Sequence, residues 1–279
     1  MSKAVLLDTN IPASQLGEGI YWDDQTSLLW WVDIAGRQIH RYDPERKEHR
    51  SWLTSKEVSF VFPQADGLLL IGLSNGVYLF DCETGEERAV ALLDLPAEHR
   101  LNDGKRDPAG RLWVGTINTA AEPSETAALY QLQNGHLVEI EGGYTNANGK
   151  AWSADGGLMF HADTGRNTVW VYDYDQATGG IPNKRVFAKI EDGSPDGLEA
   201  DCVGNLYAAI YGGSRVDILS MRGDVISPIS LPVPNVTNCC VGGSRQKTLF
   251  ITTAFDGMSD EERSSAPLSG HVFKVELDG

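Results

Sequence analysis

Cysteine is scarce in this sequence, with four residues in a chain of 279. Cys82 and Cys202 stand alone, Cys239 and Cys240 are neighbours, and neither a Cys-x-x-Cys pair nor a cluster of cysteine with histidine occurs. This count is too low for a disulfide scaffold of this length, and the spacing excludes a typical thiolate zinc site. We therefore expect the protein to work in a reducing compartment, the cytoplasm.

Positive charge is also scarce. Lysine and arginine number 23 against 39 aspartates and glutamates, which gives a net charge of −16. Proteins that bind nucleic acid gain affinity by neutralising phosphates with cationic side chains, whereas an acidic surface repels the phosphates. We expect neither nucleic acid nor an anionic membrane surface as a partner.

Long apolar runs are missing from the start of the chain. The run Ala4-Val-Leu-Leu ends at Asp8. It is far shorter than the core of a signal peptide or the roughly 20 residues of a membrane-spanning helix. We expect a protein that is neither exported nor anchored.

The composition is otherwise that of a folded globular protein. Hydrophobic residues make up 41% and charged residues 22% of the chain, which supplies enough apolar surface for a core. Neither a linker nor a shift in composition divides the sequence. We expect one domain over residues 1–279, since all-β domains of this size are common.

One short phrase recurs along the chain: a turn with Asp or Gly, followed by an apolar run that opens with leucine. An example is Asp107-Pro-Ala-Gly-Arg before Leu112-Trp-Val-Gly-Thr. The copies recur about every 44 residues. Their opening leucines are Leu28, Leu69, Leu112, Leu158, Leu206 and Leu249.

Each copy continues into a second amphipathic strand, such as Thr168-Val-Trp-Val-Tyr-Asp. Short strands at a period of about 40–50 residues are typical of β-propeller blades, so the sequence predicts an all-β, six-bladed β-propeller. A β-sandwich has no reason to repeat one phrase six times. We expect Ala4-Val-Leu-Leu to complete the blade that holds His271 to Leu277, and Met258 to Pro267 to form an exposed loop.

Polar residues recur at one position of the repeat. The residues ten positions before each leucine are Glu18, Ser59, Asn102, Asn148, Asp196 and Cys239. Equivalent positions of the innermost strands meet around a propeller axis, and buried Asp, Glu or Asn is rare unless paired or bound to metal. The oxygens of Glu18, Asn148 and Asp196 suit Ca²⁺, Mg²⁺ or Mn²⁺, and the lack of three histidines argues against a typical catalytic zinc site.

Each of these residues also has a simpler interpretation. Asn148-Gly149 and Asp196-Gly197 are turn signals, and Glu18 between two glycines fits an exposed acid. Arg100 fits a surface ion pair, or a donor to a polyhydroxylated or anionic substrate. His161 lies in an apolar run and fits a core histidine. The absence of a Gly-x-Ser-x-Gly motif leaves serine hydrolysis without support.

Several phrases together resemble the regucalcin (senescence marker protein) and gluconolactonase family of six-bladed propellers, and the resemblance runs nearly end to end. The phrases are Leu16-Gly-Glu-Gly with Trp22-Asp, Trp31-Val-Asp-Ile, Arg100-Leu-Asn-Asp-Gly-Lys-Arg-Asp, Gly110-Arg-Leu-Trp-Val-Gly-Thr, Asn148-Gly with Ala151-Trp-Ser-Ala-Asp-Gly, and Pro195-Asp-Gly-Leu. The sequence departs from the family at Ile20, where Pro is common, and at Lys150, where an apolar residue is usual.

The resemblance implies one divalent cation, Ca²⁺, Zn²⁺, Mg²⁺ or Mn²⁺, held by Glu18, Asn148 and Asp196. It also implies that Arg100 and Asn102 contact the substrate, a sugar lactone that is hydrolysed to an aldonic acid. The cation would polarise the lactone carbonyl and Asp196 would act as general base.

Two features leave alternatives open. Ala120 stands where mammalian members of the family carry a Glu that helps to bind sugar, so the substrate preference is an open question. The same scaffold also suits an esterase or phosphotriesterase, or a calcium-binding regulatory protein without catalysis, because fold does not fix function.

Overall fold

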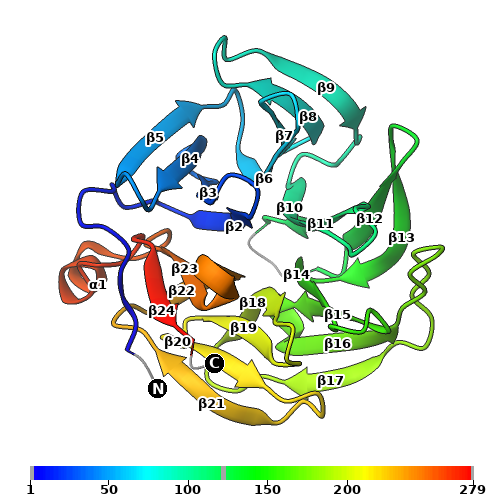
Figure 1. The fold of residues 1–279 in the computed structure, drawn as a ribbon. Helices are drawn as coiled ribbons and strands as arrows, with labels where there is room; N and C mark the ends of the chain where they lie inside the picture. The colour runs from blue at the N-terminus through cyan, green and yellow to red at the C-terminus, as the bar shows by residue number, and fades with distance from the viewer. Residues whose placement is uncertain (1–2, 121–123, 278–279) are drawn as a thin grey trace.

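The computed structural model describes residues 3–120 and 124–277. Within these ranges the strands form six antiparallel sheets of four strands each, arranged around a central axis (Figure 1). The protein is therefore an all-β, six-bladed β-propeller, and the prediction from the repeat is confirmed. Among the described residues, no helix is both long and apolar enough to cross a bilayer.

Each blade begins with an innermost strand and proceeds outward by hairpins. The first three blades are β2 to β5 (Gly17–Asp23, Leu28–Asp33, Gln38–Asp43, Glu48–Leu53), β6 to β9 (Val58–Pro63, Leu68–Leu73, Gly76–Asp81, Glu87–Leu92) and β10 to β13 (His99–Arg106, Leu112–Asn118, Ala127–Gln133, His136–Tyr144). The next two are β14 to β17 (Ala147–Trp152, Leu158–Asp163, Thr168–Asp173, Arg185–Lys189) and β18 to β21 (Ser194–Ala200, Leu206–Tyr211, Arg215–Leu219, Val225–Ser230).

The sixth blade is shared by both ends of the chain. Its strands are β22 (Asn235–Gly242), β23 (Thr248–Ala254), β24 (Phe273–Glu276) and, at the outer edge, β1 (Val5–Leu6). Val5 pairs with Lys274, and the Leu7 amide donates to the Val272 carbonyl at 2.9 Å. The predicted closure of the ring by the N-terminal run is confirmed.

The segment from Met258 to Pro267 is exposed as expected, but it contains a short helix, α1 (Asp260–Ser265). The Ser259 hydroxyl accepts from the Glu262 amide at 3.3 Å, and the Glu262 carboxylate accepts from the Ser259 amide at 2.8 Å. This capping box satisfies two amides at the helix start. The Ser-x-x-Glu spacing was the signal for the helix, which the expectation of a simple loop missed.

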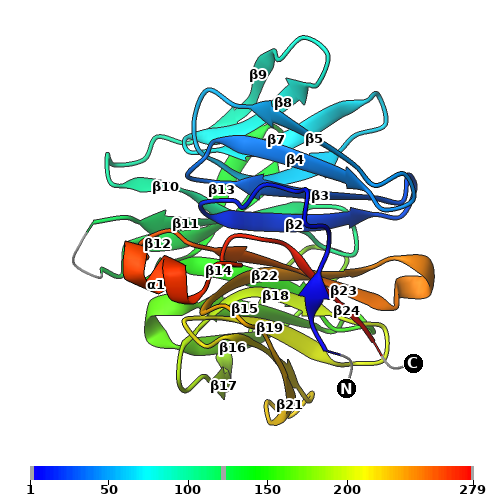
Figure 2. The ribbon, with the colours of Figure 1, turned by 90° about the vertical axis from the view of Figure 1, so that its left-hand side faces the viewer.

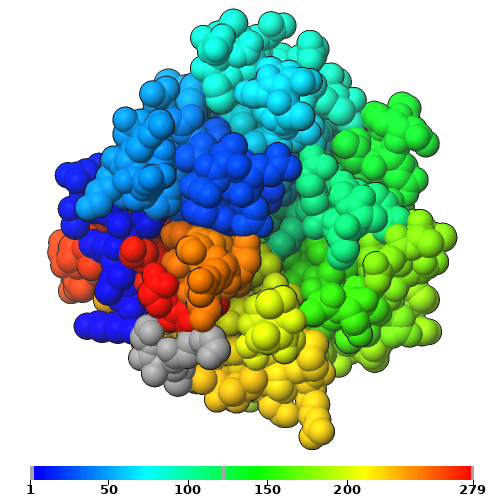
Figure 3. Space-filling view, in the orientation of Figure 1, coloured from blue at the N-terminus to red at the C-terminus, as the bar shows by residue number. Residues whose placement is uncertain are grey.

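The propeller has two faces of different character. The innermost strands start on one face, which we call the site face, and run to tight turns on the other, the hairpin face. Figure 2 shows α1 on the site face at the left and the blue β2–β3 turn on the hairpin face at the right. Figure 3 shows the hairpin face in space-filling form, with the blades meeting at its centre.

Apolar side chains fill the spaces between neighbouring blades. Phe160 and Val171 of the fourth blade, for example, pack with Leu206 and Ile210 of the fifth and are buried. The alternating pattern of the strands places these residues on the sheet faces, so the core is divided among the blade interfaces.

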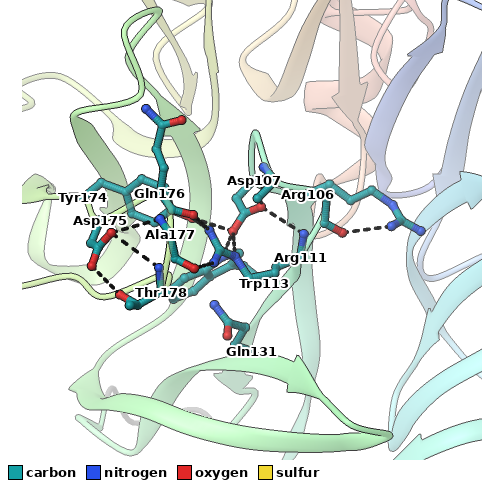
Figure 4. A network of polar contacts seen from close by, with 12 residues as sticks. Arg106, Asp107, Arg111, Trp113, Gln131, Tyr174, Asp175, Gln176, Ala177 and Thr178 are labelled. Carbon is teal, nitrogen blue, oxygen red and sulfur yellow. Dashed lines mark hydrogen bonds and ion pairs between the residues drawn. The ribbon is translucent and has the colours of Figure 1, made fainter.

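A polar network also joins the third and fourth blades (Figure 4). The Asp107 carboxylate accepts from Arg111 Nε at 2.6 Å, from Trp113 Nε1 at 3.1 Å and from the Tyr174 hydroxyl. Arg111 Nη2 also donates to the Gln176 carbonyl at 2.6 Å. The network fixes the β10–β11 turn against the next blade on the hairpin face.

Candidate functional site

All six innermost strands carry a β-bulge at the same level. In β14, Ala147 pairs with Asp163 and Lys150 with His161, so Asn148 and Gly149 together oppose one residue of β15. A bulge of this kind re-aims a side chain and is common beside active sites. The first residues of the bulges are Gly19, Ser59, Asn102, Asn148, Asp196 and Thr237.

The bulges settle the alternative that Asn148-Gly149 and Asp196-Gly197 shape turns, because both pairs lie inside strands. A Cβ atom on Gly149 would lie 2.3 Å from the Asp196 carbonyl oxygen. A Cβ atom on Gly197 would lie 2.1 Å from Asn238 Oδ1. The innermost strands of the fourth, fifth and sixth blades therefore approach closely only because glycine follows Asn148 and Asp196.

Two of the six predicted positions differ from this register. Cys239 lies beyond the bulge of β22, where it packs in the core with Ala209 and Ile251. Its expected place at the axis is wrong, because more residue pairs separate the bulge from the turn in β22–β23 than in β10–β11, so counting ten residues back from the leucine stops short of the bulge. Glu18 precedes the bulge of β2 by one residue, yet its carboxylate is buried.

Asn238 is a residue of this site that the repeat count missed. Its Nδ2 donates to Glu18 Oε2 at 2.9 Å, which joins the sixth blade to the first. The Gly19 amide donates to the same oxygen at 3.0 Å. Glu18 is thus held in place by its own bulge and by the neighbouring blade, and it is not an exposed acid.

Negative charge is concentrated here. Burial, and then the Asp103 carboxylate, raise the pKa of Glu18 to about 7. Burial, and then the carboxylates of Glu18 and Asp103, raise the pKa of Asp196 well above its usual range. Two mutually repelling carboxylates in a buried position favour a positive charge between them, because a cation stabilises their ionised forms.

The oxygen atoms of the site also suit a cation. Asn148 Nδ2 donates to Thr164 Oγ1 at 3.0 Å. Asn148 Oδ1 and Asp196 Oδ1 are buried and have no hydrogen-bond partner among the described residues. Buried polar atoms are normally paired, and carboxylate and amide oxygens are the ligands that hard divalent cations prefer. Glu18, Asn148 and Asp196 therefore fit the cation that the sequence predicts.

This donor set differs from a carboxylate and imidazole cluster. Within residues 3–120 and 124–277, no group of three or more His, Cys, Asp or Glu side chains is arranged to hold a metal ion. The candidate site combines two carboxylates with one amide, and its third donor is therefore a neutral oxygen.

Arg100 and Asn102 lie together at the start of β10. Arg100 Nη1 donates to Asn102 Oδ1 at 3.0 Å, and Asn102 Nδ2 donates to Asn146 Oδ1 at 2.9 Å. Arg100 Nε is 3.7 Å from the half-exposed Glu57 carboxylate, while the Arg100 side chain is only 12% exposed. Arg100 is therefore more enclosed than an ordinary surface ion pair, and burial lowers its pKa.

Lys150 is a second residue that the sequence did not place in the site. Its side chain is fully buried, and Nζ donates to the carbonyls of Asn148 at 2.7 Å and Asp103 at 2.9 Å. Nζ is also 3.5 Å from Asp103 Oδ2. The ammonium group compensates part of the local negative charge and fixes the backbone of Asn148. The only signal was a lysine where the family usually has an apolar residue.

The remaining two predicted positions lie outside this cluster. His161 is fully buried, and its Nδ1 is 3.2 Å from the Gly149 carbonyl, as expected for a core histidine. Ala120 is exposed on the connection after β11, with its amide donating to Asn118 Oδ1 at 2.9 Å. Because β11 runs toward the site face, this connection lies on that face of the propeller.

Comparison with known proteins shows close relatives over almost the whole chain. Residues 16–255 match the family model described as "SMP-30/Gluconolactonase/LRE-like region". The chain is similar to regucalcin of Danio rerio (35% identity, covering 94% of this chain and 90% of the relative). It is also similar to 6-deoxy-6-sulfogluconolactonase of Pseudomonas putida (32% identity, covering 95% and 92%).

A solved structure agrees with these relatives. The calcium-binding protein regucalcin from Agrobacterium tumefaciens superimposes with a TM-score of 0.92 at 26% identity, covering 99% of this chain and 94% of that one. The family predicted from the sequence phrases is thus confirmed by sequence and by fold. The chain belongs to the SMP-30/gluconolactonase/LRE-like family.

Proposed function

We propose that the protein is a sugar lactonase that opens an aldonolactone to its aldonic acid with the help of one divalent cation. The observation that carries the proposal is that the side chains of Glu18 and Asn148 lie against that of Asp196, with two buried oxygens that lack a partner among the described residues. The activity named for the Pseudomonas putida relative and the calcium binding named for the Agrobacterium relative support it.

The three oxygen donors would hold the cation. When bound, a divalent cation supplies Lewis-acid polarisation of the lactone carbonyl and lowers the pKa of nearby water. Three protein ligands leave room for substrate and water, because Ca²⁺ accepts six to eight oxygens.

Asp196 would act as general base on the attacking water. Its carboxylate is buried and has one oxygen without a partner among the described residues, so it is placed to accept a proton. The neighbouring carboxylates raise its pKa, whereas a bound cation lowers it, and the two effects oppose each other.

Arg100 and Asn102 would position the sugar. Asn102 is held by Arg100 and Asn146, and the guanidinium group of Arg100 offers several donors in a fixed plane. Donors held in this way would orient ring hydroxyls for attack, and orientation accounts for a large share of catalysis.

The experiment compares Glu18→Gln, Asn148→Ala and Asp196→Asn with the wild type. Each variant should bind the cation more weakly and hydrolyse aldonolactones at least ~10²-fold more slowly, because it loses a ligand charge or a ligand. Asp196→Asn should be the slowest, since it loses a ligand and the base. Proton release from a panel of aldonolactones and calorimetric titration of Ca²⁺ provide the measurements.

Asp66→Asn is the matched control, because Asp66 is exposed on the β6–β7 turn of the hairpin face. It should keep wild-type activity and cation affinity. Retained cation binding and rate in all three site variants would overturn the site. Cation binding without hydrolysis of any lactone would favour a calcium-binding protein without catalysis.

A further inference from the structure

A pocket of about 500 Å³ lies on the hairpin face, between the first and second blades. The β2–β3 turn and the β6–β7 turn border it, and both lie on the face shown in Figure 3. Its volume is in the range of small-molecule sites. The residues that form the candidate cation site do not line it, and it opens on the opposite face of the propeller.

The pocket contains an arginine, Arg41, for which the described part of the chain supplies no polar partner. Arg41 lies on β4, and its guanidinium carbon is 5.9 Å from the ring centres of both Trp30 and Trp52. Its buried Nε has no hydrogen-bond partner among the described residues, and no carboxylate of the described chain lies within 4.0 Å. A guanidinium group held on aromatic rings with free donors is prepared to bind an anion.

The two tryptophans complete a polar and aromatic wall. Their rings stack at 5.9 Å with an interplanar angle of 19°. Trp52 Nε1 is engaged, donating to the Cys82 carbonyl at 2.9 Å. Trp30 is only 6% exposed, and its indole N–H has no acceptor among the described residues. A buried N–H without a partner is costly, so a ligand that accepts this bond would stabilise the pocket.

The charge of the pocket is positive although the chain is acidic. Among the lining residues Asp23 is the only carboxylate, and it already accepts bonds from the Gln25 amide at 3.1 Å and the Thr26 hydroxyl. The lining also contains two positively charged guanidinium groups, those of Arg41 and Arg106. Figure 4 shows the Arg106 side chain extending away from the Asp107 network.

Arg106 has only neutral partners among the described residues, and its Nη1 donates to the Gly110 carbonyl at 3.1 Å. Its Nη2 is 3.4 Å from Gln64 Oε1, and its guanidinium carbon lies 5.6 Å from the Phe62 ring centre. The thiol of Cys82, which also lines the pocket, adds no negative charge at neutral pH, because burial raises its pKa to about 11.

We propose that this pocket binds a monosaccharide that carries a carboxylate or a phosphate group. The anionic group would pair with Arg41 and Arg106, and a hydroxyl would accept from the Trp30 indole. The aromatic rings that line the pocket would pack against the apolar faces of the sugar ring. This site is separate from the proposed lactonase site and does not depend on it.

The test titrates the full chain with D-glucuronate, with D-glucose 6-phosphate and with uncharged D-glucose, using calorimetry at low ionic strength. At least one anionic sugar should bind more tightly than glucose, and the tighter one identifies the anionic group. Arg41→Gln should weaken that binding at least ~10-fold, because a charged hydrogen bond is lost. The affinity of Arg41→Lys should lie between those of the wild type and Arg41→Gln, since an ammonium group keeps the charge but cannot bind an anion in a bidentate way.

Arg50→Gln is the matched control, because Arg50 pairs with Arg41 across β4 and β5 but is exposed. It should change the affinity by less than ~2-fold. Asp196→Asn should bind the anionic sugar as tightly as the wild type does. If this variant lost the binding, the ligand would belong to the candidate site at the propeller axis, and the proposal would be overturned. Absence of binding by the wild type, or equal binding of glucose, would also overturn it. Thermal unfolding of each variant verifies that it is folded.

Discussion

Glu18 differs from the other residues of the candidate site in its position relative to the β-bulge of its strand. Asn102, Asn148 and Asp196 occupy the bulges themselves, whereas Glu18 precedes its bulge and reaches the site beside Gly19, which has a left-handed φ of 55°. A side chain on Gly19 would meet the Ser59 carbonyl oxygen at 2.8 Å. The position of the Glu18 carboxylate therefore depends on a neighbour that has no side chain.

Arg100 offers a test that separates substrate binding from cation binding. Its guanidinium group contacts Asn102 and approaches Glu57, and it is not among the oxygen donors of the site. Arg100→Ala should lower kcat/KM for the lactone about 10-fold or more, through KM or kcat, because a positioning donor is lost. Its affinity for Ca²⁺ should stay within a few-fold of the wild type, as measured by calorimetry.

The control for this substitution is Arg222→Ala, which removes an exposed arginine from the turn between β20 and β21. It should leave both quantities unchanged. A parallel loss of cation binding in Arg100→Ala would contradict the assignment of Arg100 to the substrate.

How much of the site could be predicted from the sequence depended on how regularly the strands and hairpins repeat from blade to blade. The repeat of turns and apolar runs predicted the six blades and placed Ser59, Asn102, Asn148 and Asp196 at one level. Counting failed for Cys239, because the paired residues Cys239 and Ile251 are farther apart in sequence than Gly104 and Val114. The last pairs before the two turns, Gly242 with Thr248 and Arg106 with Leu112, have the same separation, so the extra length lies in the paired strands, which the period of the repeat does not report.

The contacts of Asn238 and Lys150 were beyond prediction for a related reason. Both residues act across blade boundaries, on Glu18 of the first blade and on Asp103 of the third. A repeat pattern identifies what each blade contributes but not which neighbour its side chains reach. The roles of Glu18, Asn148 and Asp196 as cation ligands remain a prediction.

The sheet of the first blade predicts a specific pH dependence of stability. His40 on β4 stacks on Trp31 with ring centres 5.0 Å apart, and its Nδ1 is 3.0 Å from His49 Nε2. Burial, and then the charge of His49, lower the pKa of His40 to about 3. The unfolded chain binds a proton at this residue below about pH 6.5, and the folded protein does not until about pH 3.

The free energy of unfolding should therefore fall as the pH decreases from about 6.5 toward 3. His40→Phe keeps a ring but cannot bind a proton, so the dependence on pH should weaken by up to about 1.4 kcal/mol per pH unit. Urea unfolding at several pH values measures this slope. His136→Phe, at an exposed position on β13, should retain the wild-type slope. Identical slopes for His40→Phe and the wild type would disprove the assignment.

At the scale of the whole molecule, the surplus of negative charge and the buried carboxylates predict a strong effect of cation removal. Chelator-treated protein should be inactive and should unfold at a lower temperature, because binding to the folded state contributes about 2.7 kcal/mol when the ion is at 100 times its Kd. Activity should return with more than one of Ca²⁺, Mg²⁺, Mn²⁺ and Zn²⁺. Rates should differ between ions more than thermal stability does, because rate depends on geometry.

Lactone hydrolysis and thermal unfolding after re-addition of each ion provide the measurements. Asp196→Asn serves as the control, since its unfolding temperature should respond weakly to every ion. Full activity after exhaustive chelation, with the metal content verified as zero, would rule out a catalytic role for the cation.

Closure of the ring by β1 affects how the protein folds, because a chain is synthesised from its N-terminal to its C-terminal end. Val5 and Leu6 precede all the other described strands in the sequence, yet their partner strand β24 ends at Glu276. Strand β1 can therefore pair only after the five blades between it and β24 have been synthesised, and pairing at such sequence separation is intrinsically slow. Until then the outer edge of the sixth blade stays open to other strands. Molecules caught at this stage would be the ones most prone to aggregate.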